Sequence, residues 1–225
     1  MMERQMIEDL EITVRAMGQE ESPRDYENLG TFYTAHRRYS SPDKPSVSGR
    51  NDGLALWKSV AKDLWMFEKG GAFEGETPSG IEMYKEQIDE VVAELDRNAV
   101  WSEVYLYDHS GTAYRASKDG NPFSCPWDSG MVGLVFCRND KALTMLGETV
   151  MTDSLRERVL KEMGEEVRVY SAWANGELYE WTVTDPDGDV IAGSSGHTDP
   201  EEAMTEAVDA ARSEIANRDE GPGLA

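Results

Sequence analysis

The sequence predicts an α+β fold: an antiparallel sheet with amphipathic helices and a C-terminal α-β-β-β-α module. Three observations predict it. Apolar residues recur at helical spacing in several segments, β-branched or alternating segments lie between them, and short Gly-, Pro-, Asn- and Asp-containing turns join the strand segments. The 225 residues, of which 39% are hydrophobic, suffice for one large or two small domains with a packed core.

The first region, residues 1–98, is predicted to be mixed. Ile7, Leu10, Val14 and Met17 recur at helical spacing, which predicts a helix over 3–17 that ends before Gly18. Aromatic and β-branched residues predict a strand at 30–36. Apolar residues at helical spacing predict two further helices, at 54–67 and 80–98.

The second region, residues 99–218, is predicted to be an antiparallel α+β region. Strand signals occur at 101–107, 112–116 and 131–137, and a helix is expected at about 153–164. Three more strands are expected at 166–173, 178–184 and 190–194, the first two joined by an Asn175-Gly176 turn and the last two by an Asp185-Pro186-Asp187-Gly188 turn. Thr198 and Glu201 form a capping-box pattern for the last helix, and residues 219–225 are expected to be a flexible tail.

The charge is strongly negative. The 44 acidic residues against 22 basic ones give a net charge of −22, which argues against direct binding to nucleic-acid phosphates. Residues 151–225 hold eighteen acids and six bases, and 51–100 hold eleven and five. Only 31–50 is basic, with four bases and one acid. This distribution predicts folded acidic faces rather than an acidic disordered tail.

The predicted setting is the host cytoplasm. No apolar run approaches the roughly 20 residues that span a bilayer, and the N-terminus lacks the pattern of a signal peptide. The two cysteines, Cys125 and Cys137, do not make a disulfide framework, so a reducing compartment is the simplest expectation. We therefore expect no membrane association.

Three motifs have an unusual composition. They are Gly30-Thr31 through His36-Arg37-Arg38-Tyr39, Tyr105-Leu106-Tyr107-Asp108-His109-Ser110-Gly111, and Phe123-Ser124-Cys125-Pro126-Trp127-Asp128-Ser129-Gly130 with Val132-Gly133. Together they resemble a family of largely uncharacterised proteins of bacteriophages and integrated mobile elements, over roughly residues 26–195. The resemblance implies a genetic context and carries no catalytic residues with it.

Four residues of these motifs form a candidate ligand or catalytic site: Asp108, His109, Cys125 and Asp128. A His beside carboxylates can act as a general base, and a Cys near a His can act as a nucleophile. A structural alternative is that the polar residues satisfy backbone amides in tight turns while Trp127 fills the core. No spacing of a known metal motif is present, so we expect no metal and no cofactor.

The acidic helices carry a different hypothesis. Carboxylates four residues apart lie about 6 Å apart along a helix, comparable to the repeat of phosphates on a nucleic-acid strand. Two such rows are Glu82, Glu86, Glu90 and Glu94, and Glu202, Glu206 and Asp209. Ordinary solvated helix faces or a high-salt habitat would explain the same charge.

These observations lead to a functional expectation. We expect a non-catalytic anti-defence protein of a phage or mobile element that mimics DNA. It would inhibit a basic nucleic-acid-binding host complex such as a CRISPR effector or restriction enzyme, acting as an anti-CRISPR or anti-restriction protein. The alternative is a small hydrolase or a metal- or ligand-binding protein using Asp108, His109, Cys125 and Asp128. A third alternative is an assembly subunit with Trp and Met at its interface.

Overall fold

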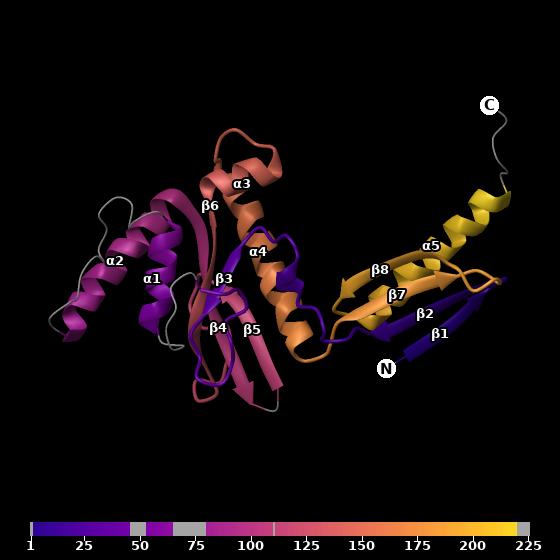
Figure 1. The fold of residues 1–225 in the computed structure, drawn as a ribbon, viewed down its shortest axis with the longest axis horizontal. Helices are drawn as coiled ribbons and strands as arrows, with labels where there is room; N and C mark the ends of the chain where they lie inside the picture. The colour runs from indigo at the N-terminus through magenta and orange to yellow at the C-terminus, as the bar shows by residue number, and fades with distance from the viewer. Residues whose placement is uncertain (1, 46–52, 65–79, 110, 220–225) are drawn as a thin grey trace. The chain divides into compact units, whose positions relative to one another are not determined.

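The chain folds into two compact units, each with its own sheet. The computed structural model describes residues 2–45, 53–64, 80–109 and 111–219 (Figure 1). Unit 1 combines the two ends of the chain, residues 1–25 and 172–225, and unit 2 comprises residues 26–171. The boundary predicted at residues 98 and 99 is therefore wrong, because α2 (Gly80–Asn98) runs directly into β4 (Ala99–His109) inside unit 2.

Unit 1 is a four-stranded antiparallel sheet covered by one helix. Its strands are β1 (Met2–Ile7), β2 (Leu10–Ala16), β7 (Tyr179–Thr184) and β8 (Val190–His197), in the order β1-β2-β7-β8. Pairing of β2 with β7, with Val14 opposite Trp181, joins the two ends of the chain. Helix α5 (Pro200–Asp219) lies against the sheet (Figure 1). It packs there through Ala203, Ala207 and Ala211. These small side chains allow a close approach of helix and sheet.

The helix predicted at 3–17 is wrong, because this segment is the β1–β2 hairpin. Leu10, Ile12 and Val14 are all buried and alternate with more exposed residues, which is the period of a strand with one buried face. Glu8 adopts a positive φ of 53° at the turn, a conformation that closes the hairpin. Leu10 and Val14 fit both this alternation and the helical spacing from Ile7 to Met17, which is why the sequence indicated a helix.

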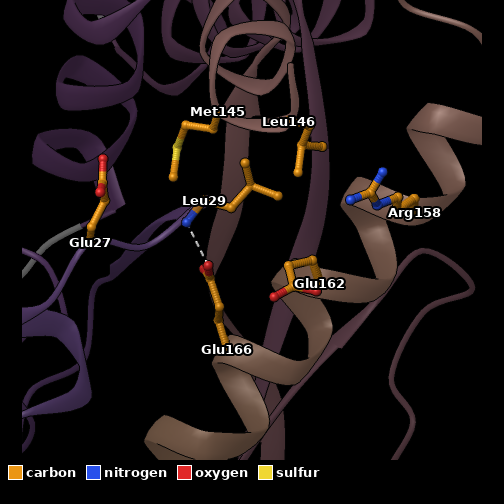
Figure 2. A pocket seen from close by; sticks show the side chains of 7 residues that line it. All are labelled: Glu27, Leu29, Met145, Leu146, Arg158, Glu162 and Glu166. Carbon is orange, nitrogen blue, oxygen red and sulfur yellow. Dashed lines mark hydrogen bonds between the residues drawn. The ribbon is translucent and has the colours of Figure 1, made fainter. Parts of the chain in front are cut away.

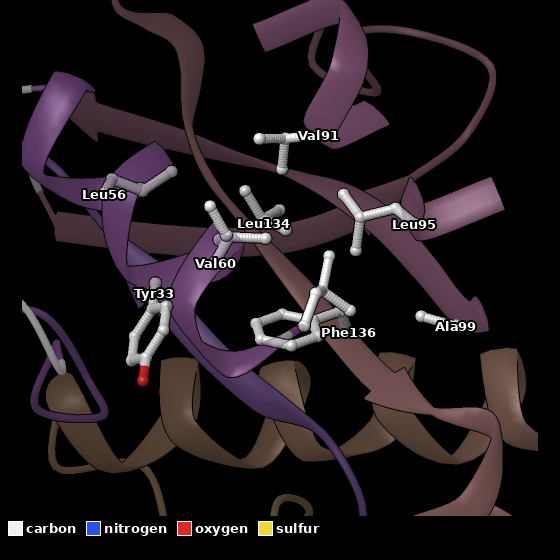
Figure 3. Close-up of a cluster of buried hydrophobic side chains, with 10 residues drawn as sticks. Tyr33, Leu56, Val60, Val91, Leu95, Ala99, Leu134 and Phe136 are labelled. Atoms are coloured by element: carbon white, nitrogen blue, oxygen red, sulfur yellow. The ribbon is translucent and has the colours of Figure 1, made fainter. Parts of the chain in front are cut away.

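Unit 2 is a second antiparallel sheet, packed on both faces. Its strands follow the order β3-β6-β4-β5, with β3 at Thr31–Thr34, β5 at Gly111–Ser117 and β6 at Ser129–Arg138. Helices α1 (Gly53–Asp63) and α2 cover one face, where Val60, Val91 and Phe136 belong to one core cluster (Figure 3). Helix α4 (Asp153–Ala174) covers the other face (Figure 1). There the ring centroids of Tyr170 and Phe32 lie 5.5 Å apart.

The predicted C-terminal α-β-β-β-α module is wrong, because residues 166–173 continue α4 instead of forming a strand. Val159, Met163, Val167 and Tyr170 are buried at helical spacing along the whole segment. The Asn175-Gly176 pair ends the helix: Gly176 has a φ of 69°, and Glu177 N–H donates to Ala172 O. The observed order is α4-β7-β8-α5, and the short helix α3 (Asn139–Leu146) was not predicted.

Several predictions are confirmed. The helix at 80–98 has the predicted bounds, and the strands predicted at 101–107 and 112–116 are present and pair as the β4–β5 ladder. The Asp185 turn joins β7 to β8, with its carboxylate accepting from the N–H groups of Asp187 and Asp189. At the start of α5, Asp199 Oδ1 accepts from Glu201 N–H at 2.8 Å. The helix predicted at 54–67 is described to Asp63, and the predicted tail lies almost wholly outside the described residues.

Within the described ranges, no helix has both the length and the apolar composition required to cross a bilayer.

Candidate functional site

The first predicted acidic row, on α2, is not a continuous surface feature. Glu90 is exposed, but Glu94 is only 7% exposed. Arg97 Nη2 donates to one Glu94 oxygen at 2.6 Å and Asn98 Nδ2 donates to the other at 2.7 Å. Glu94 is therefore removed from the predicted contact residues, because it lies on the buried side of α2 and is neutralised there. The side chains of Glu82 and Glu86 lie outside the described residues.

The second predicted row, on α5, lies at the surface. Glu202, Glu206 and Asp209 are exposed, whereas Ala203 and Ala207 face the sheet. Glu206 Oε2 lies 3.4 Å from His197 Nδ1, and Asp209 Oδ1 lies 3.7 Å from Arg212 Nη1. The pair of Asp209 with Arg212 is exposed at both ends, and an exposed pair contributes little free energy and breaks readily. The Glu206 carboxylate stays exposed although the His197 ring beside it is largely buried. The three carboxylates are thus accessible to a partner.

The negative charge is distributed unevenly between the two units. Unit 1 contains twenty acidic and five basic residues, a net charge of −15 in 79 residues. Unit 2 contains twenty-four acidic and seventeen basic residues, a net charge of −7 in 146 residues. Most of the excess negative charge therefore lies in the smaller unit. Counting charge along the sequence did not reveal this, because unit 1 is made of the two ends of the chain.

The alternative site is brought together in part. Asp108 N–H donates to Asp128 O at 2.8 Å, and the Cys125 thiol donates to Asp128 Oδ2 at 3.3 Å. His109 does not join them: it is exposed and stacks on Tyr107, with ring centroids 6.2 Å apart. Successive residues of a strand point to opposite faces, which separates the side chains of Asp108 and His109. Cys125 and His109 therefore do not form the nucleophile–base pair considered from the sequence.

Asp108 is engaged by neighbours from the first motif. Arg38 forms an ion pair with Asp108 Oδ2, and Tyr39 Oη donates to Oδ1 at 3.0 Å. Both carboxylate oxygens thus serve to position the segment that follows β3. Among the residues that the structure describes, no group of three or more His, Cys, Asp or Glu side chains is placed to hold a metal ion.

A depression beside Asp108 was missed by sequence reasoning. It has a volume of about 380 Å³, and its lining includes His36, Arg38, Trp127 and Asp128. The prediction that Trp127 fills the core is wrong, because its side chain is 92% exposed. A tryptophan between Pro126 and Asp128 in a Gly- and Pro-containing loop was the available signal, since such loops run over the surface.

A second cavity, of about 240 Å³, lies between α3, α4 and the segment before β3 (Figure 2). Glu166 lines it and accepts hydrogen bonds from the N–H groups of Leu29 at 2.6 Å and Gly30 at 3.0 Å. A Cβ on Gly30 would lie 2.8 Å from Val135 Cγ2 and 2.9 Å from Met163 Cγ. This part of the first motif therefore anchors the start of β3 against α4. Glycine is required at position 30 because a larger side chain would collide with Val135 and Met163.

Fold and sites together define a two-unit α+β protein with one strongly acidic unit. No protein-family model matches the chain, and neither the curated proteins nor the solved structures compared with it give a match. The resemblance to phage and mobile-element proteins stays a prediction.

Cys137 is the other cysteine, and it is buried on β6. Burial raises the pKa of its thiol from 9.0 to about 11. Below pH 9 the thiol is protonated in both the folded and the unfolded protein, and its contribution to the unfolding free energy is fully present. Between pH 9 and 11 the thiol ionises in the unfolded protein but not in the folded one, so this contribution is lost as the pH rises. Over this interval we expect the free energy of unfolding to fall by about 2 to 3 kcal/mol more than in Cys137→Ala. Urea unfolding of both proteins across this pH range measures the difference, and parallel curves would contradict it.

Proposed function

We propose that the protein is a non-catalytic anti-defence protein of a phage or mobile element, acting through unit 1. Unit 1 would occupy the cationic groove of a host nucleic-acid-binding complex, such as a CRISPR effector or a restriction enzyme, in place of nucleic acid. The observation that carries this proposal is the net charge of −15 on a folded unit of 79 residues. Such a field steers association with a basic surface and raises its rate.

The construction of α5 supports the proposal. Its buried alanine stripe packs on the β1-β2-β7-β8 sheet, so that the exposed carboxylates of Glu202, Glu206 and Asp209 are carried on a supported helix. Glu202 and Glu206 are one turn apart, about 6 Å along the axis. The turn between β7 and β8 adds the exposed residues Asp187 and Asp189. Fixed charges lose less conformational entropy on binding than charges on a disordered tail.

The test is charge reversal combined with salt. We expect the chain to capture a basic nucleic-acid-binding protein from a bacterial lysate at about 50 mM salt and to release most of it by about 200 mM, since counterion-dependent contacts weaken steeply with salt. The triple variant Glu202→Lys, Glu206→Lys, Asp209→Lys is expected to lose at least 10-fold in affinity for the captured protein, measured by calorimetry. Added DNA is expected to compete with the wild-type chain.

A matched control separates a binding surface from total charge. Asp119, Glu148 and Glu157 are exposed residues of unit 2, and their replacement by Lys changes the net charge by the same amount. This control is expected to retain binding within a few-fold. Equal losses in both triple variants would mean that acidity acts non-specifically, as in a chain adapted to high salt. Unchanged binding by the α5 variant would overturn the proposal.

A further inference from the structure

Trp127 is exposed to solvent on a loop that several hydrogen bonds hold in place. Ser129 Oγ accepts from Asn121 Nδ2 at 2.9 Å and donates to Cys125 O at 2.5 Å. The Cys125 thiol in turn donates to Asp128 Oδ2, and Asp128 O accepts from β4. An indole carries one of the largest apolar surfaces of any side chain, so leaving it exposed forgoes considerable hydrophobic free energy. A tryptophan that is presented in this way is placed for contact with a ligand.

The depression beside the indole offers hydrogen-bond donors. His36 Nδ1 accepts from Arg38 N–H at 3.3 Å, so the neutral ring carries its proton on Nε2. Desolvation by burial lowers the pKa of His36, and Arg38 and Arg37 lower it further against the opposing effect of Asp108, which favours this neutral form. The ring is held by stacking on Tyr39, with centroids 5.0 Å apart.

Arg38 supplies most of the donors. Its side chain is 67% exposed, and its ion pair with Asp108 fixes one end of the guanidinium group. A guanidinium has five N–H donors, and the pair with Asp108 is made through Nη2, so donors remain for a ligand. Asp108 is occupied by Arg38 and Tyr39. A ligand that fits must therefore present an anionic acceptor to Arg38 and a flat ring to Trp127.

We propose that this depression binds a nucleoside monophosphate. The base stacks on the Trp127 indole, and the phosphate accepts hydrogen bonds from the Arg38 guanidinium and the His36 imidazole. Arginine suits phosphate because its planar fork matches the phosphate oxygens. Asp128 adds an acceptor that suits an exocyclic amino group of the base, as carboxylates do for cytosine N4.

A mononucleotide fits better than a nucleic-acid strand. The volume of about 380 Å³ falls within the range of small-molecule sites. The net charge of −22 opposes a polyanion far more than a single phosphate. The site belongs to unit 2, so it is independent of the acidic unit on which the proposed function rests.

The experiment is calorimetric titration of the full chain with AMP. We expect saturable binding of AMP, and binding at least 10-fold weaker for adenosine, which lacks the phosphate, and for ribose 5-phosphate, which lacks the base. Trp127→Ala is expected to weaken AMP binding by about 10-fold or more, since stacking of one base on an aromatic side chain has this magnitude. Arg38→Gln is expected to weaken AMP without affecting adenosine.

Tyr26→Ala is the matched control, because Tyr26 is a 65% exposed aromatic residue of unit 2 that does not line the depression. It is expected to bind AMP like the wild type. Thermal unfolding checks that Trp127→Ala stays folded, as expected for an exposed side chain. Absence of saturable AMP binding, or equal binding by Trp127→Ala, would overturn the inference. The α5 triple variant is expected to keep AMP binding, which separates this result from the test of the proposed function.

Discussion

Gly133→Ala is expected to destabilise unit 2 by about 4 kcal/mol or more, a large part of the unfolding free energy of a typical domain. Gly133 pairs with Thr34 of β3 on one side and Val104 of β4 on the other, in the centre of the sheet. A Cβ on Gly133 would lie 2.0 Å from Tyr33 O and 2.8 Å from Thr34 Cα. Both atoms belong to the backbone of β3, so relief requires moving a whole strand rather than a side chain.

Gly130 provides the control on the same strand. A Cβ there meets nothing within 4 Å, so Gly130→Ala is expected to change stability by less than about 1 kcal/mol. Urea unfolding monitored by circular dichroism measures both variants. If Gly133→Ala were as stable as Gly130→Ala, the β3–β6 pairing would be wrong. The consequence extends to the Trp127 depression, because β3 leads into His36 and Arg38.

The elements that could be predicted from sequence are those with a long, unambiguous periodicity. The helix at 80–98 was predicted with its observed bounds, because its apolar residues recur at helical spacing over about four turns. Residues 166–173 were not, because Val167 and Tyr170 suit a strand locally, and the following Asn175-Gly176 pair serves helix ends as well as hairpins. Long-range contacts decide between these choices, such as those of Tyr170 with Phe32 and Tyr114 on distant strands.

The candidate sites show the same limit. Acidic composition predicted exposed carboxylates on α5, and their exposure is confirmed. Composition did not show that Glu94 is buried and paired with an exposed Arg97, or that residues 1–25 and 172–225 share one sheet. The ion pair between Arg38 and Asp108 joins residues seventy positions apart. Sequence spacing alone does not select which carboxylate Arg38 pairs with.

Ile12→Asp is expected to unfold unit 1, with a loss of about 5 kcal/mol. Ile12 is fully buried in the cluster that includes Trp181 and Ala207. The substitution removes a buried apolar side chain and places an unpaired carboxylate in its position, and both effects oppose folding. Thr13→Asp is the control, because Thr13 is half-buried and belongs to the other face of β2. It is expected to cost less than about 2 kcal/mol.

These two variants test whether the N-terminal segment forms strands or a helix. A helix over 3–17 with a stripe of Ile7, Leu10, Val14 and Met17 places Ile12 away from that stripe, and Ile12→Asp would then be mild. In the hairpin, Ile12 lies on the buried face together with Leu10 and Val14. Unit 2 is expected to stay folded in Ile12→Asp, because its core cluster shares no residue with that of unit 1. Limited proteolysis distinguishes the outcomes: cleavage confined to residues 1–25 and 172–225 is expected, whereas protection of both segments would contradict the strand assignment.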